Sequence, residues 1–156
     1  MSNKGLGTNI VCQIGIVVEN IDRAIEAYSE IFNQPMPEVS VTAPLEKAHT
    51  RYRGEPTEAR AKLAFFDMGQ VNVELIEPIG GPSTWRDFLE ENGEGVHHIA
   101  FFVDDTEEAV AFLETKGVDV VQQGDYTGGR YTYLDSTPQL AVMLELLENF
   151  DQEEEA

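Results

Sequence analysis

The chain has 156 residues, of which 42% are hydrophobic, and its 10 Lys and Arg against 29 Asp and Glu give a formal net charge of −19. This length favours one compact domain, and the acidic balance argues against nucleic acid or an anionic membrane as a partner. The sequence has no signal-peptide pattern and no apolar run of membrane-spanning length, so we expect a cytoplasmic protein with no membrane partner.

The first half of the chain predicts one helix and several strands. The residue types and their periodicity give a strand over 11–18, a helix over 21–32 that begins after the N-cap Asn20, and strands over 60–67 and 71–77. Between them, the stretch from Gln34 to Glu58 has four prolines and little periodicity. It predicts one strand and a mobile loop.

A short helix over about 82–92 is expected to link this half to a second one. The second half repeats the order of elements: a strand over 99–103, a helix over 106–116, a strand that begins at 118, and strands over 130–135 and 141–147. Residues 151–156 form an acidic tail, for which we expect a solvated end without chemistry.

An internal repeat relates the two halves. "CQIGIVVENIDRAIEAY" from Cys12 aligns with "HHIAFFVDDTEEAVAFL" from His97, which places Gln13 on His98, and "NVELIEP" aligns with "MLELLEN", which places Glu74 on Glu145. We therefore predict an α+β fold within a single domain over 1–150. Two tandem βαβββ modules, over about 10–80 and 95–148, form a curved mixed sheet around a metal site.

The repeat-related polar residues are the candidate site. Small neighbours on the same strand face, such as Gly15 and Ala100, leave room above the strand. A carboxylate in an apolar strand needs a cation, a hydrogen-bond network or a proton. We interpret the set as four ligands of one divalent ion: Gln13, Glu74, His98 and Glu145. The mixture of nitrogen and oxygen donors favours Co²⁺, Mn²⁺, Ni²⁺ or Zn²⁺.

Two other histidines are assigned different roles. If its strand is regular, His97 points to the face opposite His98, so it is expected to pack or to form hydrogen bonds rather than to bind the metal. His49 is expected on the surface. The segment Tyr126–Asp135 is interpreted either as a flexible lip over the site or as a plain hairpin.

The motifs "QIGIVVENIDRAIEAY", "VELIEP", "GEGVHHIAFFVDD" and "VMLELLE" resemble the vicinal oxygen chelate superfamily, also called the glyoxalase/bleomycin resistance/dioxygenase superfamily. Within it, they are most similar to the methylmalonyl-CoA epimerase family. The resemblance covers almost all of Ile10 to Glu148. It implies paired βαβββ modules, a single divalent ion at the four positions above, an acyl-CoA or other thioester substrate, and a homodimer.

One position departs from the epimerase pattern. The epimerases usually have histidine where this chain has Gln13, whereas a set of Gln, Glu, His and Glu is similar to glyoxalase I. No motif matches the glutathione-binding arginines of that enzyme. Three functions stay open: an epimerase or isomerase, a glyoxalase I-like lactoylglutathione lyase, and a non-catalytic small-molecule-binding member of the same fold.

The two enzymes share the removal of a proton next to a carbonyl. We expect Glu145 to be both ligand and base, and to leave the metal when the substrate chelates. Glu74, or a residue between Gln34 and Glu58, would serve the other face. Two catalytic glutamates, Glu145 and Glu74, are thus predicted.

Overall fold

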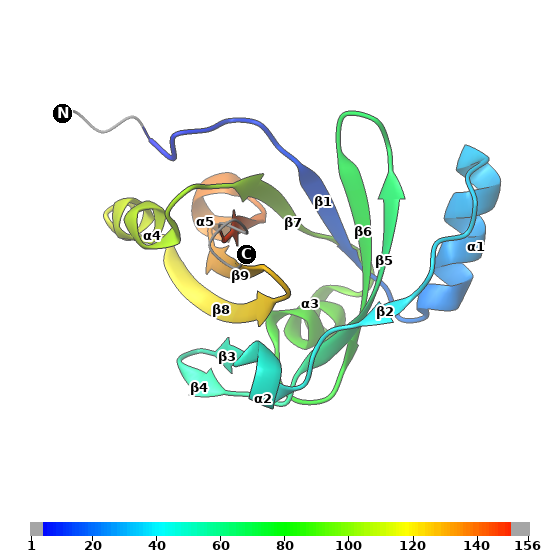
Figure 1. Ribbon diagram of the computed structural model, residues 1–156, viewed down its shortest axis with the longest axis horizontal. Helices are drawn as coiled ribbons and strands as arrows, with labels where there is room; N and C mark the ends of the chain where they lie inside the picture. The colour runs from blue at the N-terminus through cyan, green and yellow to red at the C-terminus, as the bar shows by residue number, and fades with distance from the viewer. Residues whose placement is uncertain (1–4, 151–156) are drawn as a thin grey trace, which may run out of the picture.

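The computed structural model describes residues 5–150, and the acidic tail over 151–156 lies outside the described residues. Within 5–150 the chain forms five helices and ten strands in one sheet, with the strand order β2-β5-β6-β1-β7-β10-β9-β8-β3-β4. The predicted α+β fold with two tandem modules in a curved mixed sheet is confirmed. Figure 1 shows the sheet curled between its outermost helices.

The long elements follow the order predicted from the sequence. In the first half they are β1 (Gln13–Val17), α1 (Ile21–Phe32), β5 (Arg60–Asp67) and β6 (Asn72–Ile79). The linker helix is α3 (Thr84–Asn92). In the second half they are β7 (Gly95–Phe102), α4 (Thr106–Glu114), β8 (Asp119–Tyr126), β9 (Gly129–Asp135) and β10 (Met143–Asn149). A four-residue helix that the sequence did not predict, α5 (Thr137–Leu140), precedes β10.

Helices α1 and α4 each begin after a side-chain cap, which for α1 is the predicted Asn20. The side chain of Asn20 accepts a hydrogen bond from the backbone N–H of Arg23, and Asp105 accepts one from Glu108. These bonds satisfy N–H groups that have no partner within the helix. Each helix therefore starts directly after the strand that opens its module, and the two halves share this strand-to-helix corner.

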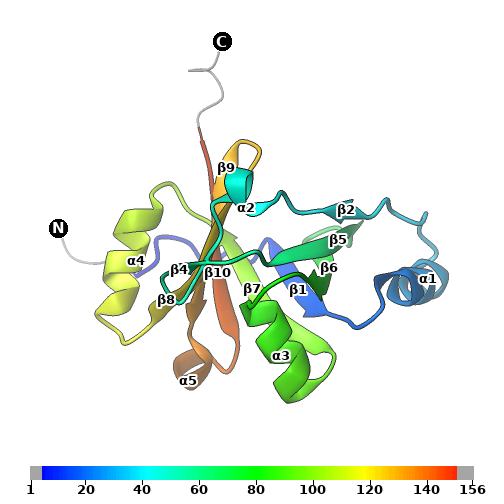
Figure 2. The ribbon, with the colours of Figure 1, turned by 90° about the horizontal axis from the view of Figure 1, so that it is seen from below.

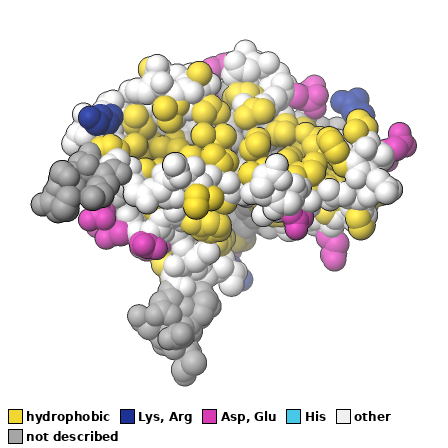
Figure 3. Space-filling model, turned by 90° about the horizontal axis from the view of Figure 1, so that it is seen from above, with side chains coloured by type: hydrophobic (Ala, Val, Ile, Leu, Met, Phe, Trp, Pro, Cys, Tyr) yellow, Lys and Arg dark blue, Asp and Glu magenta, His cyan; other side chains and the backbone are white. Residues whose placement is uncertain are grey.

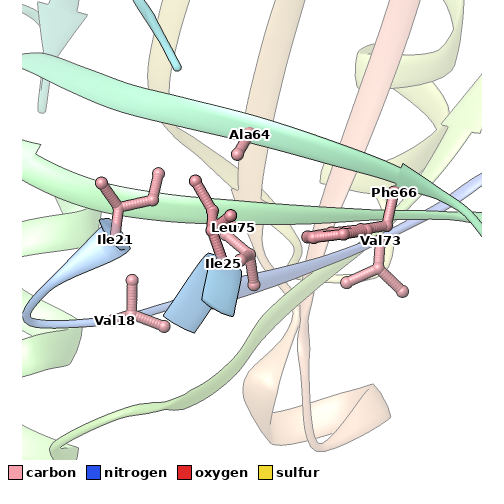
Figure 4. Packing of buried hydrophobic residues seen from close by; sticks show 7 residues of the cluster. All are labelled: Val18, Ile21, Ile25, Ala64, Phe66, Val73 and Leu75. Atoms are coloured by element: carbon pink, nitrogen blue, oxygen red, sulfur yellow. The ribbon is translucent and has the colours of Figure 1, made fainter. Parts of the chain in front are cut away.

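Each outer helix covers its own half of the sheet, and each has its own core. Figure 4 shows the first core, in which Ile21 and Ile25 of α1 pack against Leu75 and Phe66 of the strands. A matching cluster lies under α4, and a third joins Trp85 of α3 to both halves. Helix α3 contacts β1, β6 and β7 (Figure 2). The two cores under α1 and α4 leave the other face of the sheet for the site, and the third core borders that site.

The segment from Gln34 to Glu58 differs from its prediction of one strand and a loop. It contains four short elements: β2 (Ser40–Val41), α2 (Leu45–Ala48), β3 (Arg51–Tyr52) and β4 (Glu55–Pro56). Strand β2 pairs with β5 of the first half, whereas β3 pairs with β8 of the second half. This segment thus crosses from one edge of the sheet to the other.

The two modules meet at the antiparallel pair β1–β7, and the register there aligns the repeat. Gln13 pairs with Ala100, and His98 pairs with Gly15. On the far side of each strand, Gly15 pairs with Glu74 and Ala100 pairs with Glu145, both in parallel ladders. The polar residues of the repeat are thus gathered around the middle of the sheet.

Apolar and acidic side chains occupy different parts of one face of the molecule (Figure 3). Apolar side chains gather in the middle of the face seen from above, and most acidic side chains lie around its edge (Figure 3). Large exposed apolar side chains among the described residues include Ile10, Phe65 and Phe102. None of the helices over 5–150 has the length and apolar character needed to cross a membrane.

Candidate metal centre

The structure brings the four predicted ligands together. Nε2 of His98 lies 3.0 Å from Oε1 of Glu145 and 3.5 Å from Oε1 of Glu74. The side-chain amide of Gln13 completes the group, with Oε1 at 3.0 Å from the same nitrogen. Over the described residues, Glu74, His98 and Glu145 form a buried cluster whose geometry could hold a metal ion.

These separations fit a chelated ion. Neighbouring ligands at right angles around an ion with bonds of about 2.1 Å lie about 3 Å apart. In the orientation of the amide described here, Oε1 of Gln13 faces only acceptors. Turned over, the same amide would donate to His98 at 3.0 Å, to Glu74 at 3.2 Å and to Glu145 at 3.0 Å. In the turned orientation the amide satisfies the imidazole and both carboxylates without a metal. With its oxygen inward it would face a cation held between the carboxylates, so the four side chains can accommodate a divalent ion.

Burial and mutual repulsion perturb the acid–base properties of the cluster. Burial raises the pKa of Glu74 to about 8, helped by the charge of Glu145 and opposed by that of His98. The pKa of His98 is raised above its ordinary value, because the charges of Glu145 and Glu74 outweigh the opposing effect of burial. Without a cation, the cluster therefore retains protons at neutral pH, and a divalent ion would displace them.

Gly15 has a role that differs from the expected one. The sequence suggested that small residues leave room for a ligand above the strand. In the structure, a Cβ atom at Gly15 would lie 2.0 Å from Cε1 and 2.4 Å from Nδ1 of His98. The space above Gly15 is therefore filled by the imidazole of His98 itself.

His97 forms hydrogen bonds, as predicted, but its strand is not regular. The pairing of β1 with β7 shifts between Gly15 and Ile16, so that His98 and Val96 have partners and His97 does not. Nδ1 of His97 lies 2.9 Å from Nδ1 of His98, and Nε2 lies 3.1 Å from Oγ1 of Thr84. The raised pKa of His98 favours the protonated ring, in which Nε2–H donates to the carboxylates and Nδ1–H donates to His97, so that Nε2–H of His97 donates to Thr84.

The environment keeps His97 neutral. Burial, and then the charge of His98, lower the pKa of His97 well below its ordinary value. A neutral imidazole has one donor and one acceptor, as this chain of hydrogen bonds requires. The hydrogen bonds continue beyond Thr84. The backbone N–H of Thr84 donates to the side chain of Gln122, which in turn donates to the hydroxyl of Tyr131 at 3.0 Å. His97, the first histidine of the pair, therefore connects the cluster to α3.

The cluster lies at a cavity of about 550 Å³, which Gln13, Glu74 and Glu145 line. Sequence reasoning missed its aromatic wall: Nε1–H of Trp85 donates to the hydroxyl of Tyr133 at 3.0 Å, and Tyr131 lies beside both rings. The alternation of Tyr131 and Tyr133 in a strand was the available signal. Residues 126, 127, 131 and 133 of the predicted lip line the cavity.

The other parts of the predicted site lie at its edge. The residues of the 34–58 segment that line the cavity have no carboxylate: Ser40, Val41, Thr42, Ala43, Ala48 and Thr50. His49 is exposed, as expected, with Nδ1 at 3.0 Å from Oδ2 of Asp125. The two glutamates of the repeat, Glu74 and Glu145, are thus the acidic groups nearest to a ligand at the cluster.

Comparisons with known proteins agree with this arrangement. The model of the glyoxalase/bleomycin resistance protein/dioxygenase superfamily matches residues 12–133. The mitochondrial methylmalonyl-CoA epimerase of Bos taurus is 32% identical over 97 residues, which is 54% of this chain and 55% of the bovine protein. The chain thus spans about half the length of that relative.

Two further similarities cover most of the chain. A 2-epi-5-epi-valiolone epimerase of Actinomyces sp is 28% identical, covering 94% of this chain and 84% of the relative. A Streptomyces coelicolor methylmalonyl-CoA epimerase variant, solved in complex with 2-nitronate-propionyl-CoA, superposes with a TM-score of 0.61 and 27% identity, covering 90% of this chain and 97% of that chain.

Proposed function

We propose that this chain, which belongs to the glyoxalase/bleomycin resistance protein/dioxygenase superfamily, is a metal-dependent epimerase. The proposed reaction moves a proton on the carbon next to a carbonyl. The observation that supports this most is the convergence of Gln13, Glu74, His98 and Glu145 at a cavity. The named relatives, which are epimerases, support the reaction type.

The proposed ligands are one pair from each half of the repeat. Gln13 and Glu74 come from β1 and β6, and His98 and Glu145 come from β7 and β10. A divalent ion held there would supply Lewis-acid stabilisation for the negative charge that develops on the carbonyl oxygen. Two carboxylates would balance its charge, and the neutral amide of Gln13 would add an oxygen donor without further charge.

The two glutamates would handle the proton. Glu145 takes it from the carbon, and Glu74 returns one from the opposite side, because their strands flank the central β1–β7 pair on opposite sides. Both side chains are buried, at 7% and 4% exposed, so bulk water has little access to the transferred proton. The aromatic wall of Trp85 and Tyr133 closes the cavity on one side.

Two substrate classes follow from the relatives. The similarity to methylmalonyl-CoA epimerases supports an acyl-CoA thioester as the substrate, and the similarity to the 2-epi-5-epi-valiolone epimerase of Actinomyces supports a molecule like 2-epi-5-epi-valiolone. A second reaction, the lactoylglutathione lyase reaction of glyoxalase I, is favoured by one observation: the amide of Gln13 faces the cluster, as the similarity of the ligand set implied. A homodimer and a cytoplasmic location remain predictions.

Proton exchange tests the reaction. Cobalt-loaded protein in D₂O should introduce deuterium at the carbon next to the carbonyl of its substrate, and NMR would follow this for methylmalonyl-CoA, for neutral keto sugars and for the hemithioacetal of methylglyoxal and glutathione. Glu145→Gln should lower the exchange rate by about a thousandfold or more, the scale expected for loss of a general base acting on carbon. Glu148→Gln, on the same strand but outside the cavity lining, is the matched control.

Two results would contradict the proposal. If the purified protein has no metal and binds none, the central element of the site is wrong. If Glu145→Gln exchanges as fast as the unmodified protein, Glu145 is not the base. Turnover of the hemithioacetal alone would instead select the lyase reaction.

A further inference from the structure

The cavity at the cluster is acidic and has no cationic lining residue among the described residues. Its lining includes three carboxylates, those of Glu74, Glu145 and Asp125, and no Lys or Arg. A divalent ion would neutralise the two glutamates. Nothing else in this lining would balance a negative group on a ligand, and a buried charge without a partner is strongly unfavourable.

The cations that lie next to the cavity are already engaged. Nε of Arg130 lies 3.1 Å from Oδ1 of Asp125, and His49 contacts the other carboxylate oxygen at 3.0 Å. Nε of Arg60 donates to the carbonyl of Thr42 at 2.8 Å. Recruiting any of these groups for a substrate would require one of these contacts to break.

The lining offers hydroxyl groups and aromatic rings instead. The phenol oxygen of Tyr133 accepts from Trp85 and that of Tyr131 accepts from Gln122, and each phenol has an O–H group of its own to donate. Thr50 is 3% exposed and adds a hydroxyl, and Trp85 is 3% exposed and adds a flat apolar face. Such a mixture suits the hydroxyls and the ring face of a neutral sugar-like molecule.

From these observations we infer that the substrate is uncharged around its reacting carbon and is a hydroxylated ketone of the size of a sugar or cyclitol. This inference rests on the proposed function, and it names the substrate class of that same site. A methylmalonyl group has a carboxylate on the reacting carbon, which would place negative charge among Glu74, Glu145 and the neutral wall. Glutathione has two carboxylates at the ends of its tripeptide, and these would find no Lys or Arg in this lining. A cavity of about 550 Å³ accommodates a small ring, since small-molecule sites span about 300–1,000 Å³.

A matched pair of chelating ligands tests the charge preference without turnover. Kojic acid is a neutral hydroxypyranone, and comenic acid is the same ring with a carboxylate in place of the hydroxymethyl group. Both present the same two vicinal oxygens to a metal. Titrated into cobalt-loaded protein and followed by the visible cobalt spectrum, kojic acid should bind at least about tenfold more tightly than comenic acid.

An added cation should reverse this preference. Val41 lines the cavity and is 47% exposed, whereas Val39 lies just outside this lining and is 38% exposed. Val41→Arg should tighten comenic acid binding relative to kojic acid by about tenfold. Val39→Arg changes the net charge equally and should leave the ratio unaltered. Both sites are exposed, so neither substitution is expected to disturb folding.

The possible results separate the two proposals. If cobalt binds and comenic acid binds as tightly as kojic acid, or neither ligand changes the spectrum, the inferred substrate class is wrong while the metal site stands. If cobalt does not bind, the proposed function fails first. An unchanged ratio in Val41→Arg, with normal cobalt binding, would also overturn the inference.

Discussion

The two halves of the molecule place their site residues in matching positions but support them differently. In the second half, His98 has no exposed surface, its ring fills the space above Gly15, and His97 accepts from its Nδ1–H. In the first half, Gln13 is half-buried, and Ala100 lies opposite it in the register. The repeat thus preserves backbone register, while the second half holds the imidazole of His98 in a fixed orientation and the first half contributes an adaptable amide.

The largest expected effect comes from removing the space above Gly15. Gly15→Ala would place a methyl group 2.0 Å from Cε1 of His98, so the buried ring must move away from the cluster. We expect a loss of stability of about 3 kcal/mol, at the upper end for overpacking, and a fall in cobalt affinity of more than about a hundredfold. Thermal unfolding and cobalt titration would measure both.

The equivalent substitution in the other half is the control. Ala100→Gly removes a methyl group opposite Gln13 and creates no contact, so it should cost about 1 kcal/mol of stability and leave cobalt binding nearly unaltered. Equal cobalt affinities in Gly15→Ala and Ala100→Gly would contradict a difference in support and would show that the two halves hold their site residues alike.

A second prediction concerns the pH dependence of the metal-free protein. The folded-state pKa of Glu74 is about 8 against an ordinary 4.5, so the folded state holds this proton where the unfolded state has lost it. Stability contributed by that proton is present below the ordinary pKa and is lost as the pH rises toward 8. The raised pKa of His98 changes the stability in the same direction. The lowered pKa of His97 changes it in the opposite direction, but only at pH values below 6.5, its ordinary pKa.

The window between pH 6.5 and 8 therefore isolates the cluster. Chelator-treated protein should lose about 2 kcal/mol of unfolding free energy across it, at about 1.4 kcal/mol for each pH unit. Glu74→Gln should show a shallower fall, and Glu46→Gln, at an exposed position, should behave like the unmodified protein. Urea unfolding at several pH values gives the free energies. An identical slope in Glu74→Gln would mean that this carboxyl group is not the buried acid of the first half.

The sequence predicted the fold and the four polar residues that converge, because both depend on local periodicity and on a repeat. Helix α1 begins and ends where Asn20 and the apolar spacing place it, and the aligned halves identified Glu74 and Glu145. The shift in register at Gly15 was not predictable, because a bulge leaves no periodic signal, and so the contact between His97 and His98 was missed.

The cavity could not be predicted from the sequence either. Strands β2 and β3 have two residues each, which is too short for an alternating pattern, yet they join the 34–58 segment to both edges of the sheet. The absence of Lys and Arg from the cavity lining among the described residues depends on which residues, distant in sequence, come together in the fold. The sequence shows Arg60 and Arg130, but only the structure shows that both are directed at other groups.

The smallest expected effect tests the support that distinguishes the second half. His97→Leu removes the acceptor for Nδ1–H of His98 while keeping a side chain of similar volume, and it should weaken cobalt binding by about tenfold. His97→Asn can still accept through its amide oxygen and should recover part of the loss. A structural role alone would alter unfolding without altering the ¹⁵N NMR signature of the His98 tautomer. If His97→Leu binds cobalt normally with that signature intact, the ring of His98 is held by its packing over Gly15, and the two halves differ only in the ligand that each supplies.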